Sequence, residues 1–253
     1  MRQRHVDNAA MGKEEKQHWV GQLRHHLGRA KALRAAANTD PRDAEDRLNL
    51  RGWQSERLAA TYRDLLDSER YHDAARFFLT DLYGPKDFSE RDHEVERILP
   101  TLSATLPASG IRTIALAIEV DALSEELDAA MVAELSRAHA MAKITGKAYA
   151  EAYRHCGKRA QRELQLKLIG EIGESLAALV RKPLVHAGLR LMRAPAKLAG
   201  LAELHMFLED GYHAFHKMGD PTEFLDTIAT RERLILEQLY DGAARPFEIP
   251  GQA

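Results

Sequence analysis

Apolar residues recur every three or four positions along most of the chain, and alternating runs of β-branched residues are absent. Residues 111–140 show the pattern most clearly. One apolar stripe there has spacings of four, three, four and four, which places its members on one face of an α-helix; they are Leu116, Val120, Leu123, Leu127 and Met131. Ala, Leu, Glu, Arg and Lys, which favour helices, fill the other long segments. The pattern predicts an all-α protein.

Proline, glycine and polar clusters divide this pattern into seven or eight predicted helices. Asp40 is predicted to be an N-cap and Pro41 the first residue of the helix that follows it. Pro100 should end a helix before a loop at 100–110. The expected helices cover residues 15–37, 41–66, 70–83, 88–99, 111–140, 147–181, 184–218 with a kink or break near Pro195, and 221–242. We expect one bundle-like domain with 111–140 and 147–181 at its centre.

Composition is consistent with a single globular unit. The chain has 253 residues, of which 45% are hydrophobic and 29% charged, and this length can bury a substantial core. No apolar run approaches the roughly 20 residues of a membrane span. The predicted organisation is an N-terminal extension with the first helix (1–40), a helical core domain (41–242) and a Pro-rich tail (243–253).

The N-terminal residues and the cysteine content favour a cytoplasmic protein. The first fifteen residues are polar and lack the apolar segment of a secretory signal. Cys156 is the single cysteine of the chain, so no intrachain disulfide can form, as suits a reducing compartment. We interpret Cys156 as a small core residue on the apolar face of helix 147–181.

Charge alternates along the chain in blocks. Residues 81–140 carry 5 Lys or Arg and 12 Asp or Glu, whereas residues 141–200 carry 12 and 4. Within the basic block a stripe spans about 60° of a helix; its members are His186, Arg190, Arg193 and Lys197. Such a stripe can bind a protein partner, an anionic membrane surface or nucleic-acid phosphates. The absence of interleaved aromatics disfavours nucleic acid, and we expect these cations to pair with acidic side chains of neighbouring helices.

A second candidate site is a metal centre on the segment 201–218. Imidazole and carboxylate groups four residues apart on a helix can chelate a transition metal; the candidates here are His205, Glu209, His213 and His216. Two Glu-x-x-His pairs have the spacing of di-iron carboxylate bundles: Glu69 with His72 and Glu90 with His93. That scheme also needs two further glutamates that face inward from separate helices; Glu119 and Glu134 are available but lie off the main apolar stripe. Iron or haem is the cofactor this hypothesis implies.

Motifs for other chemistry are absent from the sequence. It contains no Gly-rich phosphate loop, no His-Glu-x-x-His, no Gly-x-Ser-x-Gly and no Cys-x-x-Cys. Two hypotheses remain open. The first is a non-enzymatic binding or regulatory protein with a protein partner or a homo-oligomeric state. The alternative is a metal- or haem-binding helical bundle, such as a di-iron-type oxidase or carrier.

Residues 77–92 (FFLxDLYGPxDFxxRD) resemble the signature of a family of uncharacterised proteobacterial all-helical proteins. The similarity extends from about Leu48 to Leu239 and includes a second segment at 207–215 (FLExGYxxF). The resemblance implies a single helical domain and carries no activity. Within the signature, Gly84-Pro85 should end a helix and Asp87 should cap the next.

Overall fold

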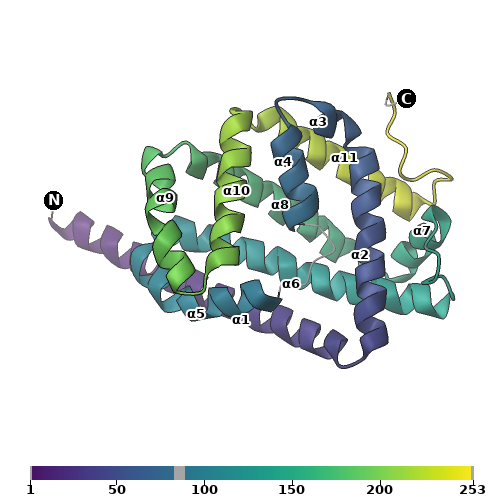
Figure 1. Ribbon diagram of the computed structural model, residues 1–253, viewed down its shortest axis with the longest axis horizontal. Helices are drawn as coiled ribbons and strands as arrows, with labels where there is room; N and C mark the ends of the chain where they lie inside the picture. The colour runs from purple at the N-terminus through teal and green to yellow at the C-terminus, as the bar shows by residue number, and fades with distance from the viewer. Residues whose placement is uncertain (1, 83–88, 252–253) are drawn as a thin grey trace.

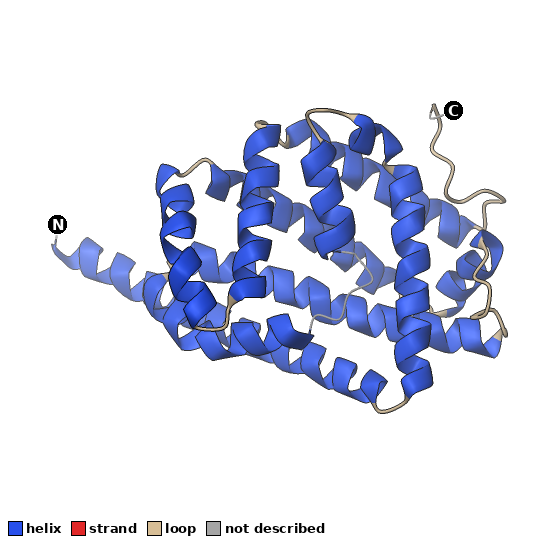
Figure 2. Cartoon of the chain, viewed as in Figure 1, coloured by secondary structure: helices blue, strands red, loops and turns tan. Residues whose placement is uncertain are grey.

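The computed structural model describes residues 2–82 and 89–251; within them, the side chains of 2–11, 81–82, 89–92, 105, 183–184 and 203–204 lie outside the description. The described residues form eleven α-helices and one π-helical segment and contain no strand (Figure 2). The elements are α1 (Arg2–Asn38), α2 (Pro41–Thr61), α3 (Arg63–Asp67), α4 (His72–Phe77), η1 (Phe78–Leu82), α5 (Ser89–Thr105), α6 (Ala108–Arg137), α7 (Gly146–His155), α8 (Arg159–Val180), α9 (Pro183–Leu198), α10 (Ala202–Met218) and α11 (Thr222–Asp241). The all-α prediction is confirmed.

The predicted number of seven or eight helices is wrong, because the chain breaks where the apolar periodicity continues. The expected helix 147–181 is interrupted at Gly157, whose φ of +61° lies in the left-handed region, so α7 and α8 are separate. The expected helix 41–66 divides at Tyr62, whose φ of −114° and ψ of 25° are not helical. The predicted corner at residues 84–87 lies outside the described residues.

Two prolines lie inside helices that they were predicted to end or to bend. Pro100 is an interior residue of α5, and Pro195 is an interior residue of α9. A proline removes its own amide donor, but the neighbouring turns keep their hydrogen bonds and can continue the helix when packing holds it. The break in the expected helix 184–218 occurs instead at Gly200, which has a φ of +67°.

Helix α6 lies at the centre of the described structure, as its sequence predicts. Four members of its apolar stripe are buried and Val120 is half-buried; the buried four are Leu116, Leu123, Leu127 and Met131. Helix α1 makes the most extensive contact with α6, and α2, α7 and α8 also pack on it. Figure 1 shows α1 and α6 along the long axis of the molecule, with α2, α4, α9 and α10 crossing them steeply.

The core beside α6 also holds a buried charge network. Glu125 of α6 is 2% exposed, and three arginines from two other helices contact its carboxylate. Arg34 of α1 places Nε 3.0 Å from Oε1, and Arg47 of α2 donates from Nη1 to Oε2 at 3.1 Å. Arg51 of α2 donates to Oε1 as well. A buried carboxylate is costly unless it is paired, so these contacts hold α1, α2 and α6 in one arrangement.

Carboxylates one turn away on either side of Glu125 extend the network. Asp121 accepts two hydrogen bonds from Arg34, each 2.6 Å long. Asp128 accepts from Arg51 Nε at 3.0 Å and from Gln54 at 3.3 Å. Three arginines therefore face three carboxylates on α6, and Arg47 also pairs with Asp43 of its own helix at 3.4 Å.

The backbone of α10 packs closely against a side chain of α4. A Cβ atom at Gly211 would lie 2.9 Å from Cζ of Phe77. The Phe77 ring also packs on Phe207 of α10, with ring centroids 5.2 Å apart. Glycine is therefore required at position 211 by the space available to it.

Removing the negative charge from the network should destabilise the fold strongly. We expect Glu125→Gln to lower the free energy of unfolding by about 3 kcal/mol, because the three guanidinium groups would lose the negative charge that they contact. Urea denaturation measures the change. Glu126→Gln is the control, because Glu126 pairs with Arg29 near the surface, and it should cost less than about 1 kcal/mol. Equal effects of the two substitutions would show that the network contributes no more than a surface pair.

Filling the space above Phe77 should also destabilise the protein. We expect Gly211→Ala to cost about 1–3 kcal/mol, because the added methyl group overlaps the ring. The double variant Gly211→Ala/Phe77→Leu should recover part of this loss, as measured by thermal unfolding. Gly170→Ala is the control, since a Cβ there meets nothing within 4 Å. A double variant whose losses simply add would contradict the steric account.

Candidate binding surface

The hairpin of α9 and α10 lies at one end of the molecule (Figure 1). Helix α9 begins with Pro183 at its first position and ends in a glycine turn, in which Leu201 N–H bonds Ala196 O at 2.8 Å and Gly200 N–H bonds Lys197 O at 3.1 Å. The left-handed φ of Gly200 permits both of these hydrogen bonds, which end the helix. Arg97 of α5 donates to the carbonyl oxygen of Gly200 at 2.5 Å. The turn between the two helices is thereby anchored to the body.

Helix α9 exposes large apolar side chains, which we call the α9 apolar face: Leu191 (77% exposed), Met192 (51%) and Leu198 (90%). Leu191 and Leu198 are seven residues apart and so lie within about 20° on the helix. The opposite, inward side of α9 is carried by Val185 and Leu189, which pack on the core cluster of α4, α10 and α11. The described part of α9 therefore has two apolar stripes, and the core covers one of them.

The members of the basic stripe predicted from the sequence have different surroundings in the structure. Arg193 forms a bidentate ion pair with Glu209 of α10, and its shortest nitrogen–oxygen distances are 2.9 Å. Arg190 and Lys197 are exposed and contact no acidic side chain among the described residues. The expected internal pairing is confirmed for Arg193, and two cations remain available beside the α9 apolar face.

The environment of Glu209 shows how α9 is attached to α10. Burial raises the pKa of this carboxyl, but the hydrogen bonds and charge of Arg193, with the nearby His205, outweigh burial and hold the pKa below its usual range. His205 is buried and its Nε2 lies 3.5 Å from the Glu209 carboxylate. The ion pair therefore stabilises the hairpin above the unfolded pKa of a glutamate, and this contribution is lost as pH falls through the lowered pKa.

The remaining histidines of the hairpin surround a tyrosine. His186 and His216 stack on the Tyr212 ring, with centroid distances of 5.3 Å and 5.4 Å. His213 meets the same ring edge-on at 5.7 Å. Of the predicted basic stripe, His186 thus packs inward while Arg190 and Lys197 stay at the surface.

The predicted metal ligands do not converge. His205 and Glu209 lie together, but Arg193 occupies the Glu209 carboxylate, and His213 and His216 pack on Tyr212. Among the residues that the structure describes, no group of three or more His, Cys, Asp or Glu side chains is placed to hold a metal ion. The geometry gives the metal hypothesis no support.

The other predicted metal residues have separate surroundings. His72 contacts the Leu66 carbonyl at 2.6 Å, and His93 is exposed. The two further glutamates available in the sequence pair elsewhere, Glu119 with His26 and Glu134 with Arg137. The Glu90 side chain lies outside the described residues.

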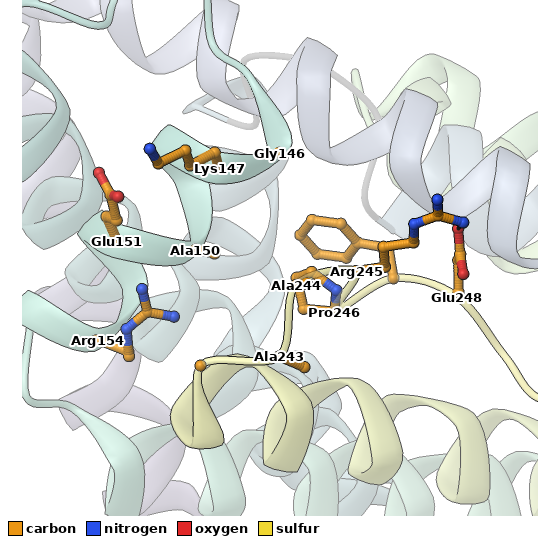
Figure 3. Close-up of a pocket in the computed structure, with 12 residues that line it drawn as sticks. Gly146, Lys147, Ala150, Glu151, Arg154, Ala243, Ala244, Arg245, Pro246 and Glu248 are labelled. Atoms are coloured by element: carbon orange, nitrogen blue, oxygen red, sulfur yellow. Dashed lines mark hydrogen bonds and ion pairs between the residues drawn. The ribbon is translucent and has the colours of Figure 1, made fainter.

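A crevice of about 490 Å³ lies between α7 and the C-terminal tail (Figure 3). Its charged groups are of both signs, and several are already engaged: Arg154 donates to Leu239 O at 2.9 Å, and Arg245 pairs with Glu248. Phe247 of the tail packs on Trp53 and Tyr149 beside it. No set of polar groups converges in this crevice, so the α9 apolar face is the better candidate.

Comparison with known proteins places most of the chain in one family. The family model described as Domain of unknown function (DUF8198) matches residues 33–246. The chain belongs to this family. No curated protein and no solved structure shows a significant match. None of the helices in the described ranges is both long and apolar enough to cross a membrane.

The sequence pattern singled out the basic stripe of α9 and did not identify the exposed pair Leu191 and Leu198. Two signals in the sequence could have separated them. The leucines repeat at an interval of seven, whereas the inward residues Val185, Leu189 and Ala196 follow a different stripe. Helix α9 also contains no Asp or Glu that could complement its cations.

Removing the arginine of the hairpin ion pair should raise the pKa of Glu209. We expect this in Arg193→Ala, because burial then acts on the carboxyl without the opposing guanidinium. Carbon-13 NMR of the glutamate carboxyl groups measures the change across a pH titration. Arg190→Ala is the control and should leave the Glu209 pKa unchanged, since Arg190 makes no contact with it. The same pKa in both variants would contradict the ion pair.

Proposed function

We propose that this protein is a helical binding protein that acts in the cytoplasm and docks a partner on the α9 apolar face. The observation that carries the proposal is the exposure of Leu191 and Leu198 on a helix whose other apolar side packs on the core. Covering one exposed leucine is worth about 1.5–3 kcal/mol. A contiguous apolar area that the fold itself leaves open supports a role in association.

The attachment of the hairpin supports the same function. Arg97 holds the α9–α10 turn, and the Arg193–Glu209 pair holds α9 to α10. These contacts keep the α9 apolar face in place, so a partner meets a preformed surface and little ordering entropy is lost on binding. The lone Cys156, half-buried beside Met131, supports the cytoplasmic setting.

The experiment replaces Leu191 or Leu198 with a photoreactive phenylalanine derivative in cells that make the full chain. We expect a crosslinked adduct of defined mass from each position. The controls are the same replacement at Leu48 and at Leu164, which are exposed to a smaller extent on other helices. Adducts at all four positions, or at none, would overturn the proposal.

A companion measurement separates docking from folding. The double variant Leu191→Ser/Leu198→Ser should unfold within about 1 kcal/mol of the unchanged protein, because exposed side chains contribute little to stability. Leu123→Ala in the buried stripe of α6 should cost about 2–5 kcal/mol. A large loss of stability in the surface variant would show that α9 needs its leucines for the fold.

A further inference from the structure

The α9 apolar face has the geometry of a helix-packing seam. Leu191 and Leu198 are seven residues apart. This interval returns a side chain to the same side after two turns and is the repeat through which two helices interlock. Ala187 and Ala194 lie beside the leucines and are exposed, so another helix backbone can approach closely. Met192 widens the face on the side away from Arg190.

The charges beside the seam have one sign. Arg190 and Lys197 are also seven residues apart, so they form a second row about 100° from the leucines. Helix α9 contains no acidic residue, and both cations lack an acidic partner among the described residues. A helix that packs on this seam therefore meets a basic flank, and acidic residues on its own flank would complement it.

The same charges disfavour a second copy of this chain as the occupant. Two α9 helices packed on each other would bring the two basic rows into one interface with no carboxylate from either α9. Like charges placed across an interface weaken association. A bilayer surface favours an apolar face with aromatic anchors, and the described part of α9 contains no aromatic residue besides His186.

We infer that the occupant of the α9 apolar face is an acidic amphipathic helix of a partner protein. The inference rests on the proposed function and names its partner class. The partner helix places leucines or similar side chains against Leu191 and Leu198, and it places carboxylates opposite Arg190 and Lys197. The apolar seam supplies affinity, and the charges select the partner and its orientation.

The test uses the full chain and a panel of labelled synthetic helices with leucine at heptad positions. One series carries glutamate beside the leucines in different registers, and a matched series carries lysine in its place. Fluorescence anisotropy should show at least about tenfold tighter binding of the best acidic helix, and the difference should shrink as salt is raised. A charge-reversed variant, Arg190→Glu/Lys197→Glu, should prefer the lysine series. Arg24→Glu/Lys143→Glu, at two exposed cations elsewhere, is the control and should keep the original preference.

The outcomes separate this inference from the proposed function. An acidic series that binds no better than the basic one overturns the inference, as does a preference that charge reversal leaves unchanged. Binding to phosphatidylglycerol vesicles in place of the helices, lost in Leu191→Ser/Leu198→Ser, overturns the inference but leaves the α9 apolar face as the binding site. Photocrosslinks that do not depend on positions 191 and 198 overturn the proposed function itself.

Discussion

One buried glutamate organises the described structure. Glu125 is surrounded by three arginines that come from α1 and α2, and these partners supply the interactions that water would otherwise provide. The contacts fix two helices against α6, and α7 and α8 pack on other parts of α6. Asp121 pairs with Arg34 and Asp128 with Arg51, so neighbouring carboxylates of α6 hold the same two helices. The network specifies which helices meet, a choice that apolar packing alone leaves less constrained.

The α9–α10 hairpin is held by a different kind of contact. A single ion pair, a glycine turn held by Arg97 and a stack of histidines on Tyr212 attach α9 to the body. The apolar side of α9 that this attachment leaves outward is the feature from which the proposed function follows. A helix held by a few polar contacts and one buried stripe can present its second stripe to a partner without a change of fold.

Much of the helical architecture could be read from the sequence, while several features of the site could not. The stripe of α6 was predicted correctly, because apolar residues at spacings of three and four must share one helix face. The break at Gly157 was missed, since the apolar spacing continues through it and only the backbone conformation shows the turn. The pairing of Arg193 with an acidic residue was expected, but its partner Glu209 depends on the angle at which α9 meets α10. Glu125 gave no signal, because its arginines lie about 74 to 91 positions away in the chain.

The sequence by itself determined the all-α class, the central helix and the basic stripe on α9, because these follow from side-chain spacing within one helix. Only the tertiary structure decided which apolar stripe of α9 packs on the core. Val185 and Leu189 face the core formed by α4, α10 and α11, whereas Leu191 and Leu198 point away from it. Both stripes are apolar and helical, so their spacing alone cannot distinguish core from surface. The distinction comes from long-range contacts, which place neighbours against one side of the helix and leave the other side to a partner.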